Sequence, residues 1–185
     1  MIIAIWVVIA VLVLVVLGLV GAYNSLVRKR IRTQEAWAQI DVQLKRRHDL
    51  IPNLVETVKG YAAHERQTLE RVIQARNQAM ASHGVQEQAQ AENVLTAALR
   101  QLFALSEAYP NLKANENFAR LQEELATTEN RIAFSRQHYN ASGAEYNTAC
   151  ESFPSNVVAG IFAFKKVEYF ELQEPREREA PQVKF

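Results

Sequence analysis

The stretch from Ile2 to Ala22 carries no charged side chain and consists almost wholly of Ile, Val, Leu, Ala and Gly. At a rise of about 1.5 Å per residue, roughly 20 apolar residues in a helix cross the ~30 Å hydrocarbon core of a bilayer. Trp6 and Tyr23 lie near its two ends, where amphipathic rings favour the membrane interface. A surface helix of a soluble domain would show a polar face, which this stretch lacks. The sequence therefore predicts a transmembrane anchor over residues 1–22.

Basic residues flank this stretch on its C-terminal side, namely Arg28, Lys29, Arg30 and Arg32. A secretory signal peptide carries its positive charges before a shorter apolar stretch, so we expect this segment to be retained rather than cleaved. Basic flanks tend to stay in the cytoplasm. The positive-inside rule therefore predicts a single-pass protein with its N-terminus outside and the rest of the chain in the cytoplasm.

The residues after the anchor are enough for one domain. Glycine and proline are scarce, with 6 Gly and 5 Pro in the whole chain, which favours helix. A formal net charge of +1 gives no electrostatic reason to bind nucleic acid, and no such partner is expected. The single cysteine, Cys150, allows no intramolecular disulfide.

Three segments carry stripes of apolar residues, with some small hydroxyl residues among them, at alternating spacings of three and four. The first stripe is Leu26, Thr33, Trp37, Ile40, Leu44, Ile51, Leu54, Val58 and Tyr61, extended by Val72 and Ala79. The second is Ala91, Leu95, Ala98, Leu102, Leu105 and Tyr109, and the third is Phe118, Leu121, Leu125, Thr128, Ile132, Ser135, Tyr139, Ser142, Tyr146 and Ala149. Such seams are typical of coiled-coil-like bundles. We expect an all-α protein: a transmembrane helix followed by an antiparallel up-and-down bundle of three long helices and a short C-terminal helix, over residues 23–172.

The expected breaks between these helices are Ser82-His83-Gly84 and Tyr109-Pro110-Asn111, both short enough to make neighbouring helices antiparallel. Pro52 lies inside the first stripe, where its ring and its missing N–H should kink or break a helix. We favour one kinked helix, because the apolar phase continues through Pro52. The alternative is that Asp49 caps a second helix with Pro52 in its first turn.

Charged residues beside the seams could fix the register of the bundle. Asp41 could pair with Arg131 or Arg136 across two helices, or all three could be solvated flanks. Small hydroxyl residues in the third stripe leave room for a large partner such as Trp37. Gly18 and Ala22 form a pair of small residues that would let two anchors pack closely, which predicts a homo-oligomer.

The C-terminal part changes character after Phe153-Pro154. Residues 157–164 are mostly apolar and are followed by Lys165 and Lys166. We expect this segment to pack across the bundle, and the alternative is that it dips into a lipid surface with the lysines at the headgroups. Residues 173–185 are expected to form a solvated, disordered tail.

No catalytic, cofactor-binding or metal site is predicted. His64-Glu65 is not followed by a second His at the spacing of a zinc-binding helix, and no glycine-rich phosphate loop or nucleophile elbow is present. Cys150 has no evident base nearby in the sequence and is expected to be a small core residue. We therefore expect a protein without enzymatic activity, the alternative being catalysis by residues with no recognisable motif.

Several segments after the anchor form a recognisable signature: YNSLV (23–27), EAWAQIDVQLKRRHDLIPNLV (35–55), YPNLKA (109–114), ENRIA (129–133) with Tyr139-Asn140, and Phe153-Pro154-Ser155-Asn156 through to Phe170. Together they resemble the signature of the LemA family of bacterial membrane proteins. The resemblance implies a single N-terminal anchor in the bacterial inner membrane, a helical bundle and no catalytic residues to carry over. It marks as motif positions, with structural roles expected, Asp41, Arg47, Asp49, Pro52, Asn53, Asn130, Arg131 and Tyr139.

Two functions follow as hypotheses. The first is a membrane-anchored scaffold of the cell envelope that binds a second copy or another membrane protein. The second is an accessory or sensor factor that regulates a membrane enzyme such as a protease, with Pro52 as the movable element. Pro52 discriminates between them, because a Pro52→Ala variant that changes stability without any membrane phenotype would remove the basis of the hinge.

Overall fold

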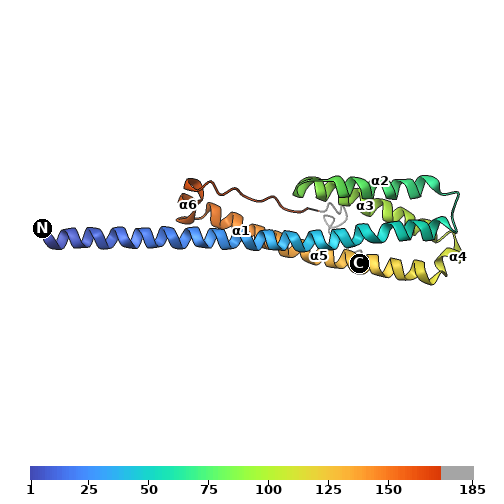
Figure 1. Cartoon of the computed structure of the whole chain (residues 1–185), viewed down its shortest axis with the longest axis horizontal. Coiled ribbons are helices and arrows are strands. Elements are labelled where there is room, and N and C mark those ends of the chain that lie inside the picture. Colours follow the sequence, from blue (N-terminus) through green and yellow to red (C-terminus); the bar gives the residue numbers. More distant parts are fainter. Residues whose placement is uncertain (172–185) are drawn as a thin grey trace, which may run out of the picture. The chain divides into compact units, whose positions relative to one another are not determined.

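The computed structural model describes residues 1–171 and consists of helices joined by short connections, with no strand in that range. The helices are α1 (Ile2–Lys59), α2 (Arg66–Ala81), α3 (Val85–Ser106), α4 (Pro110–Lys113), α5 (Glu116–Glu151) and α6 (Ser155–Ile161) (Figure 1). The prediction of an all-α fold is confirmed. The expected tail over 173–185 lies outside the described residues, as does the last residue of the range 23–172.

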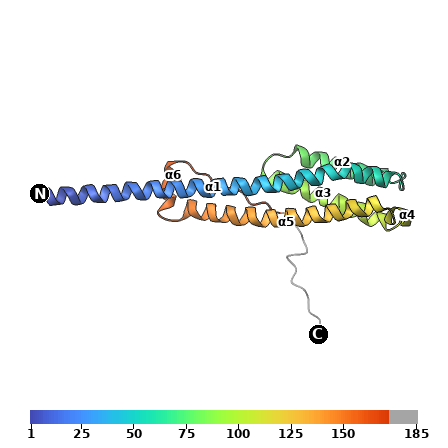
Figure 2. The same cartoon turned by 60° about the horizontal axis from the view of Figure 1, so that its bottom comes forward.

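The chain forms two compact units, and α1 and α5 each contribute to both. Unit 1 comprises Met1–Asp41 and Phe134–Tyr169, and among the described residues unit 2 comprises Val42–Ala133 with Phe170 and Glu171. In each unit a stretch of α1 lies beside a stretch of α5 (Figure 2). The two units are described separately below.

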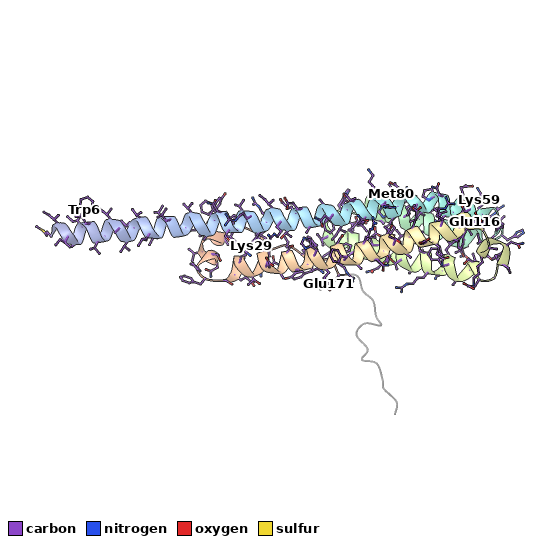
Figure 3. All side chains as sticks on the ribbon, turned by 90° about the horizontal axis from the view of Figure 1, so that it is seen from below. Trp6, Lys29, Lys59, Met80, Glu116 and Glu171 are labelled. Carbon is purple, nitrogen blue, oxygen red and sulfur yellow. The ribbon has the colours of Figure 1, made fainter. Side chains whose placement is uncertain are left out.

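Unit 2 is an antiparallel arrangement of the last part of α1, α2, α3 and the first part of α5. Its core contains the apolar residues predicted from the stripes, among them Ile51, Leu54, Val58, Val72, Ala79, Leu95, Leu102, Phe118 and Leu125. Lys59 and Glu116 lie at the same end of this unit (Figure 3), as the antiparallel course of α1 and α5 requires. The expected breaks at 82–84 and near Pro110 separate α2 from α3 and α3 from α5, with Gly84 at a φ of 86° that suits glycine.

The structure differs from expectation between Lys59 and Arg66, where the first predicted helix divides into α1 and α2. Gly60 follows the last residue of α1, and the backbone N–H groups of Tyr61 and Ala62 both donate to the carbonyl of Val58. Glycine has low helix propensity, and Ala62 turns back into the core. The bundle therefore has four long helices rather than three, and Tyr61 is exposed instead of lying on the stripe.

Pro52 does not break α1, which continues through it to Lys59. The alternative of a second helix beginning at Asp49 is therefore wrong. A proline inside a helix leaves the carbonyl four residues earlier without its usual donor. That carbonyl belongs to His48, and the Nε of Arg76 on α2 donates to it at 2.7 Å.

Unit 1 joins the first part of α1 to the end of α5, to α6 and to the extended segment that follows. The hydroxyl of Thr33 donates to the carbonyl of Ser142 at 3.2 Å, and the ring of Trp37 packs on that of Tyr139 at 5.3 Å between centroids. Both contacts follow the predicted seam. The large ring of Trp37 thus meets another large ring, while the small Thr33 lies against the small Ser142.

Residues 165–168 form a strap that runs back along α5. The close approach occurs at Gly143, where an added Cβ would lie 3.2 Å from Cγ2 of Val167. The helix continues past Gly143 to Glu151, as expected from the persistence of the stripe. Glycine gives the neighbouring segment room for this close approach and does not end the helix.

Candidate functional site

A cluster of buried polar side chains lies inside unit 2, contributed by α1 and α3. Glu92 is 1% exposed, and Arg47 and His48 are also buried. The Nε2 of His48 lies 2.7 Å from Oε1 of Glu92, and Nη1 of Arg47 lies 3.5 Å from Oε2 of the same carboxylate. Gln88 donates to Oε1 of Glu92 at 3.0 Å. The carboxylate is thus held by three side chains from two helices.

Arg47 connects this cluster to the surface of unit 2. Its Nη1 lies 2.9 Å from Oε2 of Glu129 on α5, and its Nη2 donates to the hydroxyl of Thr96 at 2.8 Å. Because a buried charge is costly unless it is paired and hydrogen-bonded, these contacts explain how Arg47 and Glu92 are tolerated in the core. The network ties α1, α3 and α5 together at a defined register.

A groove of about 260 Å³ opens beside Arg47, between α1, α3 and α5. Its lining combines polar and apolar side chains, namely Arg47, Thr96, Leu99, Arg100, Phe103, Gln122, Leu125, Ala126 and Glu129. Such a mixture, with an apolar base and polar groups at the edge, is typical of surfaces that bind a partner. This groove is the candidate interaction site of unit 2.

The basic residues that follow the candidate membrane span form a second surface, in unit 1. A groove of about 380 Å³ is lined by Ser25, Arg28, Lys29, Ile31, Arg32 and Glu35, all on α1. Lys29 and Arg32 lie 3.6 and 3.9 Å from the carboxylate of Glu145 on α5. The basic flank is therefore partly paired within the unit, and these exposed pairs contribute little to stability.

The strap is fastened to α5 by three side chains. The hydroxyl of Tyr139 donates to the carbonyl of Glu168 at 2.8 Å, and that of Tyr146 donates to the carbonyl of Lys165 at 2.9 Å. Asn147 both donates to the carbonyl and accepts from the N–H of Val167, each at 2.9 Å. These bonds fix the residues that follow α6.

Both tyrosines are shifted toward their protonated forms. Burial raises the pKa of Tyr146 to about 12, and a hydrogen bond with Cys150 adds to the effect. Burial and the negative charge of Glu168 raise the pKa of Tyr139. A neutral phenol is the form that can donate to the strap carbonyls.

Within residues 1–171 no group of three or more His, Cys, Asp or Glu side chains is placed to hold a metal ion. His48 lies in the buried cluster, where its ring contacts the carboxylate of Glu92. Cys150 is partly buried and contacts the small core formed by Leu26, Val158 and Ala159.

A family model described as the LemA family matches residues 36–185. The chain belongs to the LemA family. Magnetosome protein MamQ from Magnetospirillum gryphiswaldense is 27% identical over 185 residues, covering 86% of this chain and 68% of that protein. Magnetosome protein MamQ 2 from Paramagnetospirillum magneticum is 27% identical over 175 residues, covering 80% and 64% respectively. Protein LemA from Metamycoplasma hominis is 26% identical over 160 residues, covering 84% and 71%.

The motif residues of this LemA-family chain divide into buried and exposed sets. Arg47 and Tyr139 are buried and make the contacts described above, while Trp37 and Arg136 are partly buried. The exposed motif residues are Asp41, Asp49, Pro52, Asn53, Asn130 and Arg131. We therefore propose that the buried motif residues act through packing, and that the exposed ones act through the backbone or the surface.

For Asp41 the structure agrees with the alternative of a solvated flank rather than with an ion pair to Arg136. In the part of the chain that the structure describes, no ion pair joins Asp41 to Arg136 within unit 1, and Asp41 is exposed. The first part of α1 is instead linked to α5 by Lys29 and Glu145. An exposed carboxylate next to a seam position was not sufficient to predict a partner.

The residues of the predicted anchor and its self-association face have different surroundings in the structure. Trp6 projects from a stretch of α1 that has no neighbouring helix in unit 1 (Figure 3), and Gly18 has open space around it. Ala22, the other half of the small-residue pair, packs against the cluster of Leu26, Val158 and Ala159. One side of the predicted self-association face is thus already occupied by α6.

Sequence reasoning missed Glu92 and Arg76. Gln88, Glu92 and Thr96 recur at intervals of four along α3, which places polar groups on one strip of that helix beside the apolar stripe. That spacing was a usable signal for Glu92. For Arg76 no local pattern was available, because its partner is a main-chain carbonyl of another helix.

Proposed function

We propose that this LemA-family protein is a membrane-anchored scaffold of the bacterial envelope, whose helical domain binds a second copy or another membrane protein. The observation that carries the proposal is that α1 supplies both the candidate membrane span and part of the helical core. Residues 2–21 of α1 are exposed along their whole length, whereas Leu26 and Thr33 are buried in unit 1. The helix is long and apolar enough near its N-terminus to cross a membrane.

The groove beside Arg47 is the proposed binding surface for the partner. Phe103, Leu99 and Leu125 offer an apolar base, and Arg100, Gln122 and Glu129 offer polar groups around it. Helices that bind in grooves place an apolar face on such a base and polar residues at the rim. We therefore propose that the partner presents a helix.

Photocrosslinking in the full-length protein in its own membrane tests this surface. A photoreactive amino acid would replace Ala126, which lines the groove, or Thr127, the next residue, which is exposed outside it. We expect an adduct from position 126 and little from position 127, with a product of twice the mass if the partner is a second copy. Equal yields at the two positions, or none at either, would contradict the proposal.

We further propose that the anchor crosses the inner membrane with the N-terminus outside and the helical domain in the cytoplasm, because the basic residues follow the span. A Thr127→Cys variant, with Cys150→Ala to remove the native thiol, can be treated in intact cells with a membrane-impermeant thiol reagent. Labelling only after permeabilisation is the expected result. Labelling in intact cells would place the domain outside.

The alternative, a sensor that moves at Pro52, has less support. The carbonyl that Pro52 leaves without a helical donor is bound by Arg76, so this turn of α1 is fastened to α2. A fastened turn favours a scaffold over a hinge.

A further inference from the structure

Four large apolar side chains of unit 1 are exposed together, all in or next to α6. Phe153 is 82% exposed, Val157 49%, Ile161 68% and Phe162 58%. A soluble surface seldom gathers so many within a short segment, and such patches mark contact with a protein or a membrane. The question is which of the two covers them.

The opposite face of α6 packs on the end of the anchor. Val158 and Ala159 form a buried cluster with Leu26, and Ala22 packs against it. Figure 1 shows α6 beside α1 at this level. Because Ala22 is the last residue of the apolar stretch, α6 lies where the candidate span ends.

Aromatic and basic side chains surround this position. The ring of Tyr23 lies 4.8 Å from that of Phe162 and 5.7 Å from that of Phe164, and the guanidinium of Arg30 lies 5.2 Å from the Phe164 centroid. Aromatic rings and cations are enriched at the boundary between acyl chains and headgroups. Lys165 and Lys166 follow directly and are exposed.

We propose that Phe153, Val157, Ile161 and Phe162 insert into the headgroup and acyl boundary of the same bilayer that α1 spans. The partner of this face is lipid. The proposal rests on the proposed anchoring of residues 2–22, which puts α6 at the membrane surface. The apolar side chains would enter the boundary while the cations after α6 remain at the headgroups, as in interfacial amphipathic segments. The segment would then be packed on the protein through one face and on lipid through the other.

Depth-dependent fluorescence quenching in the full-length protein tests this. Single cysteines at Ile161 or Phe153, in a Cys150→Ala background, would carry an environment-sensitive fluorophore in vesicles whose lipids bear a quencher on the acyl chain. Phe134→Cys is the matched control, since Phe134 is 74% exposed in the same unit but lies on α5 away from α6. Leu14→Cys marks the span. Thermal unfolding followed by circular dichroism would verify that each variant is folded.

We expect labels at 161 and 153 to lose fluorescence to the lipid quencher as the label at 14 does, while the label at 134 is unchanged. Labels at 161 and 153 that behave like the one at 134, with 14 still quenched, would overturn the lipid contact but leave the anchor intact. If the labels at 161 and 153 are quenched neither by the lipid quencher nor by a water-soluble quencher, a protein covers this face. That result would also overturn the lipid contact. If the label at 14 is not quenched, both the anchor and this proposal fail.

Discussion

The Nε of Arg76 donates at 2.7 Å to the carbonyl oxygen of His48, the main-chain acceptor that Pro52 leaves without a donor in α1. A proline inside a helix costs about 3 kcal/mol, in part because this hydrogen bond is lost. Here a side chain from a neighbouring helix replaces the missing N–H. The proline thus becomes an attachment point for α2, and α1 continues without interruption.

Removal of the Arg76 donor should therefore cost less stability in a variant in which residue 52 again has a backbone N–H. We expect Arg76→Met to lower the free energy of unfolding by about 1.5–3 kcal/mol, the range for hydrogen bonds from charged groups. In a Pro52→Ala background, where residue 52 regains its N–H, the loss should be smaller by about 1 kcal/mol. A double-mutant cycle by chemical denaturation measures this coupling. Strictly additive losses would show that Arg76 does not substitute for the missing donor.

Loss of the buried carboxylate of Glu92 should lower the free energy of unfolding more than loss of the partly exposed carboxylate of Glu129. We expect Glu92→Ala to cost about 3–5 kcal/mol, because it leaves Arg47 and His48 in the core without their shared partner. Glu129 is 40% exposed, and its loss leaves Arg47 bound to Glu92 and Thr96, so Glu129→Ala should cost about 1 kcal/mol or less. Chemical denaturation of both variants under the same conditions compares their free energies of unfolding.

A third variant separates loss of the charge pair from loss of packing. Combined Arg47→Met and Glu92→Leu substitutions remove both charges and retain side-chain volume, and should recover much of the stability lost in Glu92→Ala. If the combined variant is as unstable as Glu92→Ala, an uncompensated charge on Arg47 is not the source of the cost, which then comes from packing and from the lost partner of His48.

Tyr146 should make the stability of unit 1 decrease at high pH. Its folded pKa of about 12 is above the ordinary value of 10.0, so its contribution is complete below pH 10 and is lost as pH rises toward 12. In that window the unfolded phenol ionises first, and the free energy of unfolding falls by at most about 1.4 kcal/mol per pH unit.

Tyr146→Phe tests this dependence. Below pH 10 the variant should be less stable by about 1 kcal/mol, because the hydrogen bond to the carbonyl of Lys165 is lost. The difference from the wild type should shrink and then reverse in sign as pH increases to 12, because only the wild type loses stability through this phenol. Fluorescence of Trp37, which packs on Tyr139, can follow unfolding in a Trp6→Phe background. A constant difference across this range would contradict the assignment.

Ala163, two residues after the last residue of α6, has a φ of 52°, in the left-handed region that L-residues other than glycine seldom occupy. The N–H of Phe164 donates to the carbonyl of Ala159 across this turn at 2.9 Å. Ala163→Gly should relieve the strain and stabilise the protein by about 0.5–1 kcal/mol. The control is Ala159→Gly inside α6, which should destabilise it by about 1 kcal/mol or more. Equal losses from both substitutions, measured by thermal unfolding, would exclude relief of strain.

Much of the fold was predictable because the core depends on spacing along each helix. The third stripe, from Phe118 to Ala149, is buried or partly buried at every position in α5. The break at Gly84 was predicted from the glycine cap. The break after Lys59 was missed because Val72 and Ala79 continue the apolar phase of α1 by coincidence in α2.

The candidate sites were less predictable, because they depend on which helices lie side by side. Arg47 was selected through the family resemblance, but its partners Glu92 and Glu129 are on other helices. The sequence predicts that the apolar segment containing α6 packs against protein or lipid. Its division into a packed face at Val158 and an exposed face at Ile161 required the structure.

The side chains of Tyr139, Tyr146 and Asn147 attach the strap through main-chain atoms of residues 165–168, and so hold a chain there with little regard to its amino acids. The hydrogen bonds would survive replacement of Lys165, Lys166 or Glu168. Val167 is constrained in size, by its contact with Gly143. Most substitutions in the strap can therefore accumulate in evolution without detaching it, so its outer surface can adapt to a different membrane or partner while α5 stays the same.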